Sequence, residues 1–299
     1  MPCHYNLYTV LFTRLLARSG RYEASKVIGV MQIQPFPLSP TAISCYLKSP
    51  KLFYWQYVRN IVPKELSADR YDHDKIFGNI WSEYVDGFYK KRADILELAV
   101  ARWRVETEGW LATKERGSYE KSLLALANCY QNSYNPDDGM RSQGSELELK
   151  TNDWHVVLDG LGDGHVIHEC KATSRAQSLK EQVWKYQNSI QARMYAVVTD
   201  AAGIVIELAF KDSPHQVFRA PIREFTTEEK LRWLNEFTDL RNEIFRPERD
   251  YVCNVEACGF TSKYRTSICP YRELCEGSDD ITNYKQRKRR EQCPPVSST

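Results

Sequence analysis

The sequence predicts a mixed α/β protein in which helices flank a central sheet and a helical lobe precedes it. Up to Tyr134, apolar residues recur mainly at helical spacing. The turn residues at 135–139 end this pattern, and the alternation of apolar and polar residues that follows is typical of strands. Helical spacing returns at 179–198 and 226–245, with short strands between these two segments.

The composition indicates a soluble globular protein. At 299 residues the chain can bury a substantial core, and its mean hydropathy is −0.55. The sequence has no apolar run of membrane-spanning length, since Arg14 and Arg18 interrupt the one early candidate. It has no secretion-signal pattern either, so we expect a cytoplasmic protein without membrane association. The net charge of only +2 implies that any basic surface is local.

The first half of the sequence is expected to be helical. Ser39 is a good N-cap for a helix that has Pro40 in its first turn. After that helix, the pattern stays helical and is rich in charged and aromatic residues. Helices are expected over residues 5–19, 41–59, 74–115 and 119–134.

Short strand-like runs fill the middle of the sequence. They are expected over residues 146–149, 156–159, 165–172, 204–210 and 216–220. Glycines and Asp163 between residues 160 and 164 supply the turn of a hairpin. The helix over 226–245 is expected to begin at a cap made by Thr226 or Thr227.

Two acids and a lysine converge at one end of that hairpin. Asp159 ends the first strand, and Glu169 and Lys171 point to one face of the second because they are two residues apart. In a chain with 27% charged residues, such a triplet is most often part of a solvated strand face. Carboxylates beside a lysine also suit a divalent metal ion and a phosphate ester, so we interpret this site as a nuclease centre. Glu146 and Glu148 share a strand face nearby, where they could contact the metal ion or a water molecule, and solvation is the simpler interpretation for both.

Asp159 and the tripeptide Glu169-Cys170-Lys171 resemble the D…(D/E)-x-K signature of the PD-(D/E)XK nuclease superfamily. The similarity is greatest to the RecB-like exonucleases, a branch with CRISPR-associated and phage-borne members. In that branch, a helix carrying Q-x-x-x-Y follows the lysine. Gln191 and Tyr195 match this motif, and they share a helix face because they are four residues apart.

This resemblance implies a restriction-endonuclease-like mixed sheet and hydrolysis of DNA phosphodiester bonds. The implied ligands of a Mg²⁺ or Mn²⁺ ion are Asp159, Glu169 and the main-chain carbonyl of Cys170. Lys171 would position or deprotonate a water molecule, and Gln191 and Tyr195 would orient the lysine or the phosphate backbone.

Two further segments resemble motifs of the same branch, each with one departure. Residues 38–57 are similar to its N-terminal motif, with Ser49 where cluster-bearing members have a cysteine. Residues 77–83 are similar to F-G-x-x-x-H-E, with Ser82 where the family has a histidine that assists metal binding. The metal site would then depend on the two acids of the hairpin, with Glu83 as a further candidate ligand.

Four cysteines near the C-terminus have the spacing C-x4-C-x10-C-x5-C. They are Cys253, Cys258, Cys269 and Cys275. Thiols so close together in a reducing cytosol indicate ligation of a metal or cluster. The last two enclose a phrase that resembles C-P-(Y/F)-x-x-L-C, which binds a 4Fe–4S cluster in the RecB-like branch. Cys258 would be a third ligand, and the fourth is either Cys45 or Cys253; with Cys253, Zn²⁺ is the alternative.

The expected organisation has five parts. They are an N-terminal helical extension (1–34), a helical lobe (35–140), the nuclease core (141–247), a cysteine-rich lobe (248–280) and a basic tail (281–299).

These features predict a metal-dependent DNA nuclease, and the resemblance implies an exonuclease that acts on DNA ends or single strands. One alternative is a catalytically weak or inactive subunit that binds DNA or supports assembly while keeping the fold and an iron–sulfur or zinc lobe. Another is a zinc-bearing regulatory protein in which the acidic hairpin is incidental.

Overall fold

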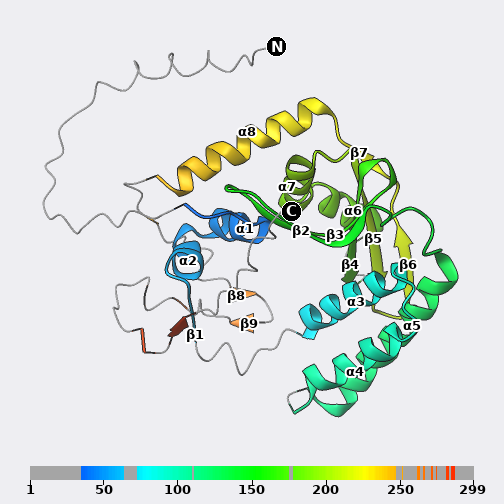
Figure 1. Cartoon of the computed structure of the whole chain (residues 1–299). Coiled ribbons are helices and arrows are strands. Elements are labelled where there is room, and N and C mark those ends of the chain that lie inside the picture. The colour runs from blue at the N-terminus through cyan, green and yellow to red at the C-terminus, as the bar shows by residue number, and fades with distance from the viewer. Residues whose placement is uncertain are drawn as a thin grey trace, which may run out of the picture. The chain divides into compact units, whose positions relative to one another are not determined.

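The computed structural model describes four long stretches of the chain, residues 35–63, 73–109, 111–174 and 178–246 (Figure 1). It also describes residues 251, 261–262, 265–266, 271, 274, 281–282 and 284–286. All of them belong to the unit Ile33–Thr299. The helix expected over 5–19 and the cysteines at 253, 258, 269 and 275 lie outside the described residues.

A mixed sheet forms the centre of this unit. Its strands are β2 (Gly144–Lys150), β3 (His155–Gly162), β4 (Val166–Thr173), β5 (Gly203–Phe210) and β6 (Gln216–Arg219), in that spatial order, and β7 (Arg223–Glu224) pairs with the start of β5. Only β4 and β5 are parallel among these pairs. A parallel pair needs a crossover, which α6 (Leu179–Gln187) and α7 (Ile190–Thr199) provide. The predicted α/β class with a central mixed sheet is confirmed.

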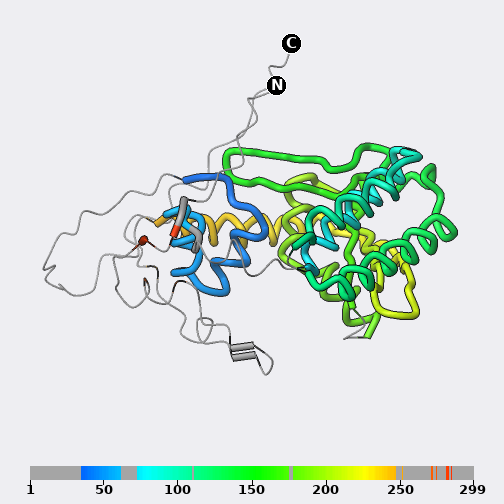
Figure 2. Tube along the Cα trace, turned by 90° about the horizontal axis from the view of Figure 1, so that it is seen from below, coloured from blue at the N-terminus to red at the C-terminus, as the bar shows by residue number. Residues whose placement is uncertain are grey.

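Helices cover both faces of the sheet (Figures 1 and 2). On one face, α1 (Pro40–Lys48), α7 and α8 (Thr227–Ile244) pack against Ile167, Ile204 and Leu208. On the other, α3 (His73–Tyr89), α4 (Ile95–Thr107) and α5 (Thr113–Ser133) form an aromatic core that reaches Cys170 and Ala209. Every residue of β5 is buried as a result, which explains its nearly continuous apolar sequence.

Three predicted helices are interrupted in the structure. The segment 41–59 divides into α1, α2 (Pro50–Phe53) and the π-helical turn η1 (Tyr54–Val58). Pro50 disfavours helical backbone at Ser49, which is extended and instead caps α2 by accepting a hydrogen bond from the Leu52 amide at 3.3 Å. The segment 74–115 divides into α3 and α4, and the segment 179–198 divides where Ser189 caps α7.

The hairpin turn lies later than the glycines suggested. β3 continues to Gly162, and the turn is the short 3₁₀ segment η3 (Asp163–His165). Gly164 has a φ of 64°, as a turn glycine often has. The cap of α8 is Thr226 rather than Thr227, because the Thr226 hydroxyl accepts a hydrogen bond from the Glu229 amide at 3.1 Å.

Residues near the C-terminus pack against the segment that follows η1. Strand β1 (Ile61–Pro63) pairs antiparallel with β10 (Tyr284–Gln286), and Tyr271 Oη donates a hydrogen bond to the Ile61 carbonyl at 2.9 Å. Ile61, Tyr271, Leu274 and Tyr284 form a small apolar cluster there. The short strands β8 (Thr261–Ser262) and β9 (Arg265–Thr266) pair with each other. Within the described ranges, no helix has the length and apolar character needed to cross a bilayer.

Candidate active site

Strands β3 and β4 separate at the candidate site. Their register pairs join residues 160–162 to residues 166–168. Just past this paired region, the Cys170 N–H donates to the Asp159 carboxylate at 2.8 Å instead of to a β3 carbonyl. The separation of the strands therefore fixes one oxygen of Asp159 against β4, beside Glu169.

Glu169 and Lys171 lie together on β4, as their spacing predicts. Lys171 Nζ donates to Glu169 Oε1. Glu169 is only 2% exposed, and its second oxygen, Oε2, has no hydrogen-bond partner among the described residues. Burial, together with the negative charge of Asp159, raises the pKa of the Glu169 carboxyl to about 7. A buried carboxylate oxygen without a partner is costly, so its retention here points to a ligand.

Lys171 is held in its charged form. Burial alone would lower the pKa of this ammonium group, but Glu169 and Asp159 outweigh burial and raise the pKa above its usual value. Lys171 therefore donates hydrogen bonds and provides a positive charge, and it does not readily accept a proton.

Ser82 and Glu146 lie beside Asp159, and neither of them is a site residue predicted from the sequence. Ser82 Oγ lies 3.4 Å from Asp159 Oδ1 and 3.3 Å from Glu146 Oε1, so its single proton can serve either acid. Glu146 has a φ of 51°, which is rare for a residue other than glycine. Burial, followed by the charges of Asp159 and Asp86, raises the pKa of Glu146. Glu146 is exposed, in agreement with the interpretation that it is solvated, and it also contacts the site through Ser82.

Glu83, the further candidate ligand, has a different partner. Its carboxylate pairs with Arg102 of α4 on the exposed surface. Ser82, at the position where the family has a histidine, is the α3 residue that contacts Asp159.

Gln191 and Tyr195 lie on α7 against the same site. They line one small pocket together with Glu169 and Lys171. Gln191 Nε2 donates to Tyr195 Oη at 2.6 Å, and Tyr195 Oη donates to the main-chain carbonyl of Val157. These hydrogen bonds attach α7 to β3 next to Asp159.

Among the predicted cluster ligands, the structure describes Cys45. It is half-buried on α1, and its thiol lies 3.5 Å from Gln56 Oε1. The four C-terminal cysteines lie outside the described residues, so the cluster stays a prediction.

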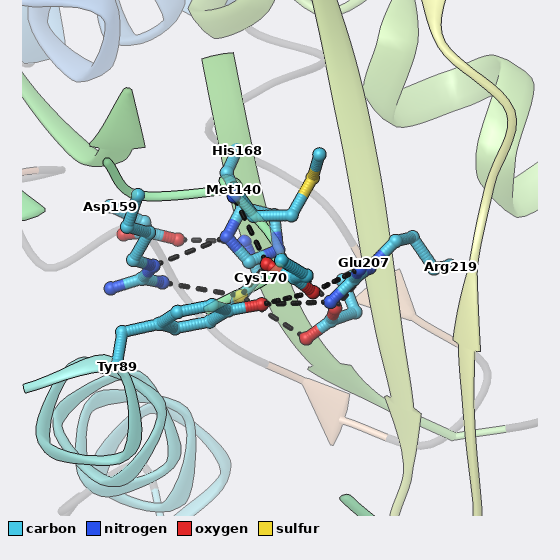
Figure 3. Close-up of polar contacts among 9 residues, drawn as sticks. Tyr89, Met140, Asp159, His168, Cys170, Glu207 and Arg219 are labelled. Atoms are coloured by element: carbon cyan, nitrogen blue, oxygen red, sulfur yellow. Dashed lines mark hydrogen bonds and ion pairs between the residues drawn. The ribbon is translucent and has the colours of Figure 1, made fainter. Parts of the chain in front are cut away.

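A second buried polar cluster lies on the opposite face of β4. Figure 3 shows His168, Cys170, Glu207 and Arg219 pointing toward one another. His168 Nε2 lies 3.3 Å from Glu207 Oε2, which also accepts from Arg219 Nε at 3.0 Å. Arg141 Nε donates to His168 Nδ1 at 3.1 Å. The sequence offered one signal for this cluster, because Glu207 is a lone acid in an otherwise apolar strand.

His168, Cys170 and Glu207 place three possible metal-ligating atoms within 4.8 Å of one another. The hydrogen bond from Arg141 decides against a metal ion there. An arginine only donates, so His168 Nδ1 carries no proton and the neutral ring keeps its proton on Nε2. A metal ion on Nε2 would require a fully deprotonated ring. The cluster is therefore a hydrogen-bonded network.

Comparison with known proteins identifies the class of protein to which this fold and site belong. The sequence profile of the PD-(D/E)XK nuclease superfamily matches residues 37–276. The chain belongs to this superfamily. A search of curated proteins gives no significant match. Among solved structures, a candidate exonuclease from Eubacterium rectale is similar, with 12% sequence identity and a TM-score of 0.47, over 87% of this chain and 100% of that one.

The network behind β4 predicts a pH-dependent contribution to stability. Burial would raise the pKa of Glu207, but the hydrogen bond from His168 Nε2 and the charge of Arg219 outweigh burial and lower it to about 2. Because the folded-state pKa is depressed, the stabilisation is fully present above the ordinary value and is lost as the pH falls through about 4.5 to about 2. We expect Glu207→Gln to lower the free energy of unfolding by about 3 kcal/mol at neutral pH. The loss should shrink in acid.

Urea unfolding of both proteins across this pH range measures the difference. Glu148→Gln is the control, because Glu148 is exposed and pairs with His155 at 2.7 Å. Its effect should stay below about 1 kcal/mol. A Glu207→Gln deficit that is unchanged at low pH would contradict the assignment.

Proposed function

We propose that this protein is a metal-dependent deoxyribonuclease that acts as an exonuclease on DNA ends or single strands. The observation that carries the proposal is that Asp159, Glu169 and Lys171 lie together, and that Glu169 Oε2 is buried without a hydrogen-bond partner among the described residues. The preference for DNA and for ends is supported by the resemblance of these residues, with Gln191 and Tyr195, to RecB-like exonucleases.

The oxygen atoms at this site fit a divalent cation. Glu169 Oε2 is buried and has no hydrogen-bond partner in the part of the chain that the structure describes, and Asp159 lies next to it with one oxygen fixed by the Cys170 N–H. In a strand, the N–H and C=O of one residue point to the same edge, so the Cys170 carbonyl faces the edge where β3 no longer pairs with β4. Two carboxylates and a carbonyl are the hard donors that Mg²⁺ and Mn²⁺ prefer. Asp159, Glu169 and the Cys170 carbonyl would hold the ion.

A cation bound there would polarise the scissile phosphate and lower the pKa of a bound water. The protein's own groups provide the rest. The Lys171 ammonium offers donors to a non-bridging phosphate oxygen and to the attacking water, and its charge opposes the negative charge that develops during hydrolysis. Gln191 donates a hydrogen bond to Tyr195, and Tyr195 donates one to β3. These two hydrogen bonds keep α7 in place beside this lysine.

Removing the charge of Asp159 or Lys171 is expected to abolish cleavage. Asn at position 159 still accepts from the Cys170 N–H, so Asp159→Asn should fold but lose metal affinity. Lys171→Met should lower the cleavage rate of labelled linear DNA at least about 100-fold. Lys121→Met, on the exposed side of α5, is the matched control and should cleave normally.

The assay also separates the proposed function from its alternative. Parallel reactions with linear single-stranded, linear duplex and circular DNA, each with Mg²⁺, Mn²⁺ or a chelator, test the need for ends and metal. Cleavage of linear DNA alone supports an exonuclease. Metal-controlled protein that binds DNA but cleaves none would instead favour a non-catalytic DNA-binding subunit.

Metal affinity is expected to depend on pH. Because the pKa of Glu169 is raised to about 7, a cation must displace a proton below that pH, and its affinity should fall by up to tenfold per pH unit. Without metal, the raised pKa has the opposite consequence for folding, since the group's contribution to stability is greatest in acid and declines as the pH rises from about 4.5 to about 7. Mn²⁺ titrations between about pH 5.5 and pH 8 measure the first effect. A pH-independent affinity would rule out Glu169 as the titrating ligand.

We also propose that the C-terminal cysteines bind a 4Fe–4S cluster, with Cys258, Cys269 and Cys275 as ligands and Cys45 or Cys253 as the fourth. One observation supports the involvement of the N-terminal segment. Tyr271, between two of these cysteines in the sequence, donates to the carbonyl of Ile61, 16 residues after Cys45. Protein purified without oxygen should be brown and absorb light at about 400 nm. Colourless protein with one equivalent of zinc would establish the zinc alternative.

A further inference from the structure

Arg141 is a buried arginine behind the strand that carries Glu169 and Lys171. Its side chain is 1% exposed. Nε donates to His168 Nδ1 at 3.1 Å, and Nη2 donates to Cys170 Sγ at 3.4 Å. Removing a guanidinium from water costs several kcal/mol, so a burial this complete calls for an explanation beyond packing.

Arg141 also faces α3. Nη1 lies 3.9 Å from Asp86 Oδ1, and the guanidinium lies over the ring of Tyr89 at 5.4 Å from its centre. Asp86 is one helical turn after Ser82, the residue whose hydroxyl contacts Asp159. One side chain therefore spans from the helix that supports Asp159 to the strand that carries Glu169.

A third contact is with β3, directly beside Asp159. Arg141 passes over Gly160, where a Cβ would lie only 2.6 Å from Arg141 Cγ and 2.9 Å from Nε. Any larger residue at position 160 would displace the arginine. A glycine is therefore needed after Asp159, because it leaves the space in which Arg141 lies against the strand.

Cys170 connects these contacts to the site. Its N–H binds Asp159, its thiol accepts from Arg141, and its carbonyl faces the proposed cation. Displacement of Arg141 would remove its hydrogen bond to the Cys170 thiol. It would also disturb the point where β3 and β4 separate, at which Asp159 and Glu169 lie.

We propose that Arg141 is a positioning residue for the metal site. It holds α3, β3 and β4 at the separation that keeps Asp159 on the Cys170 N–H and leaves Glu169 Oε2 open to a cation. The proposal rests on the proposed function, because it concerns the same site. It differs from a general role in stability, since the other arginine of the network, Arg219, binds Glu207 at 3.0 Å and Asp138 at 2.6 Å. Within the described part of the chain, Arg219 makes no hydrogen bond or ion pair with Asp159, Gly160 or Cys170.

Two variants test the role by different routes. Arg141→Lys keeps the charge but loses the two directed hydrogen bonds, and Gly160→Ala keeps the arginine but displaces it. Arg219→Lys is the matched control at the other end of the network. The measurement is the dissociation constant of Mn²⁺ without DNA, obtained from the electron paramagnetic resonance signal of free Mn²⁺, after thermal unfolding has shown each variant to be folded.

We expect both test variants to raise the Mn²⁺ dissociation constant by at least about tenfold, and Arg219→Lys to change it by less than about twofold. High Mn²⁺ should then restore most of the cleavage in the test variants. A purely structural role would reduce the amount of folded protein and leave the dissociation constant of the folded fraction unchanged.

The outcomes separate the two proposals. Wild-type affinity in both Arg141→Lys and Gly160→Ala would overturn the positioning role alone. Equal weakening by Arg219→Lys would also overturn it, because the effect would then belong to the whole network. If the unmutated protein bound no Mn²⁺ and cleaved no DNA, the proposed function would fail together with this inference.

Discussion

The hydrogen bond from the Cys170 N–H to the Asp159 carboxylate is the contact on which the geometry of the site depends. Where two strands part, the main-chain groups of each lose their partners, and an unsatisfied buried N–H costs about 1–3 kcal/mol. Here a side chain replaces the missing carbonyl. This hydrogen bond pairs the free N–H of Cys170 and also places the Asp159 carboxylate beside Glu169. The separation of the strands and the pairing of the two acids therefore have the same cause.

Strand β4 is unusual because both of its faces carry charged or polar groups in the interior. On the side of α7 lie Glu169 and Lys171, and on the side of α3 lie His168 and the Cys170 thiol. Behind the strand, the two arginines donate hydrogen bonds to His168, Cys170 and Glu207, and Arg141 Nη1 faces Asp86 in an ion pair at 3.9 Å. In front of the strand, Glu169 Oε2 has neither a hydrogen bond nor an ion pair among the described residues. A rigid hydrogen-bonded network on the α3 side and an open ligand atom on the α7 side are the arrangement expected of a preorganised binding site.

Sequence patterns were sufficient for those parts of the site that depend on local spacing. Glu169 and Lys171 share a face because they are two apart on a strand, and Gln191 and Tyr195 because they are four apart on a helix. Ser82, Glu146 and Arg141 could not be assigned in this way, because each comes from a different element and only tertiary packing brings it to Asp159 or β4. The interruption of the helix at Ser49 was locally encoded by Pro50. In contrast, β3 extends through residues 160–162 because these residues pair with β2 and β4, which their glycine-rich sequence did not indicate.

The pairing of β1 with β10 has a consequence for how the chain reaches its folded state. Tyr271 and Ile61 are 210 residues apart in the sequence, so this contact closes a very long loop. Such closure is entropically expensive and slow to form, and during synthesis it must wait until Tyr271 and β10 have left the ribosome. The parallel pair of β4 and β5 needs only the crossover through α6 and α7, and it can assemble much earlier. The segment after η1 can therefore acquire its partner strand only once β10 has been synthesised, when the residues of the acidic sheet are already available to fold.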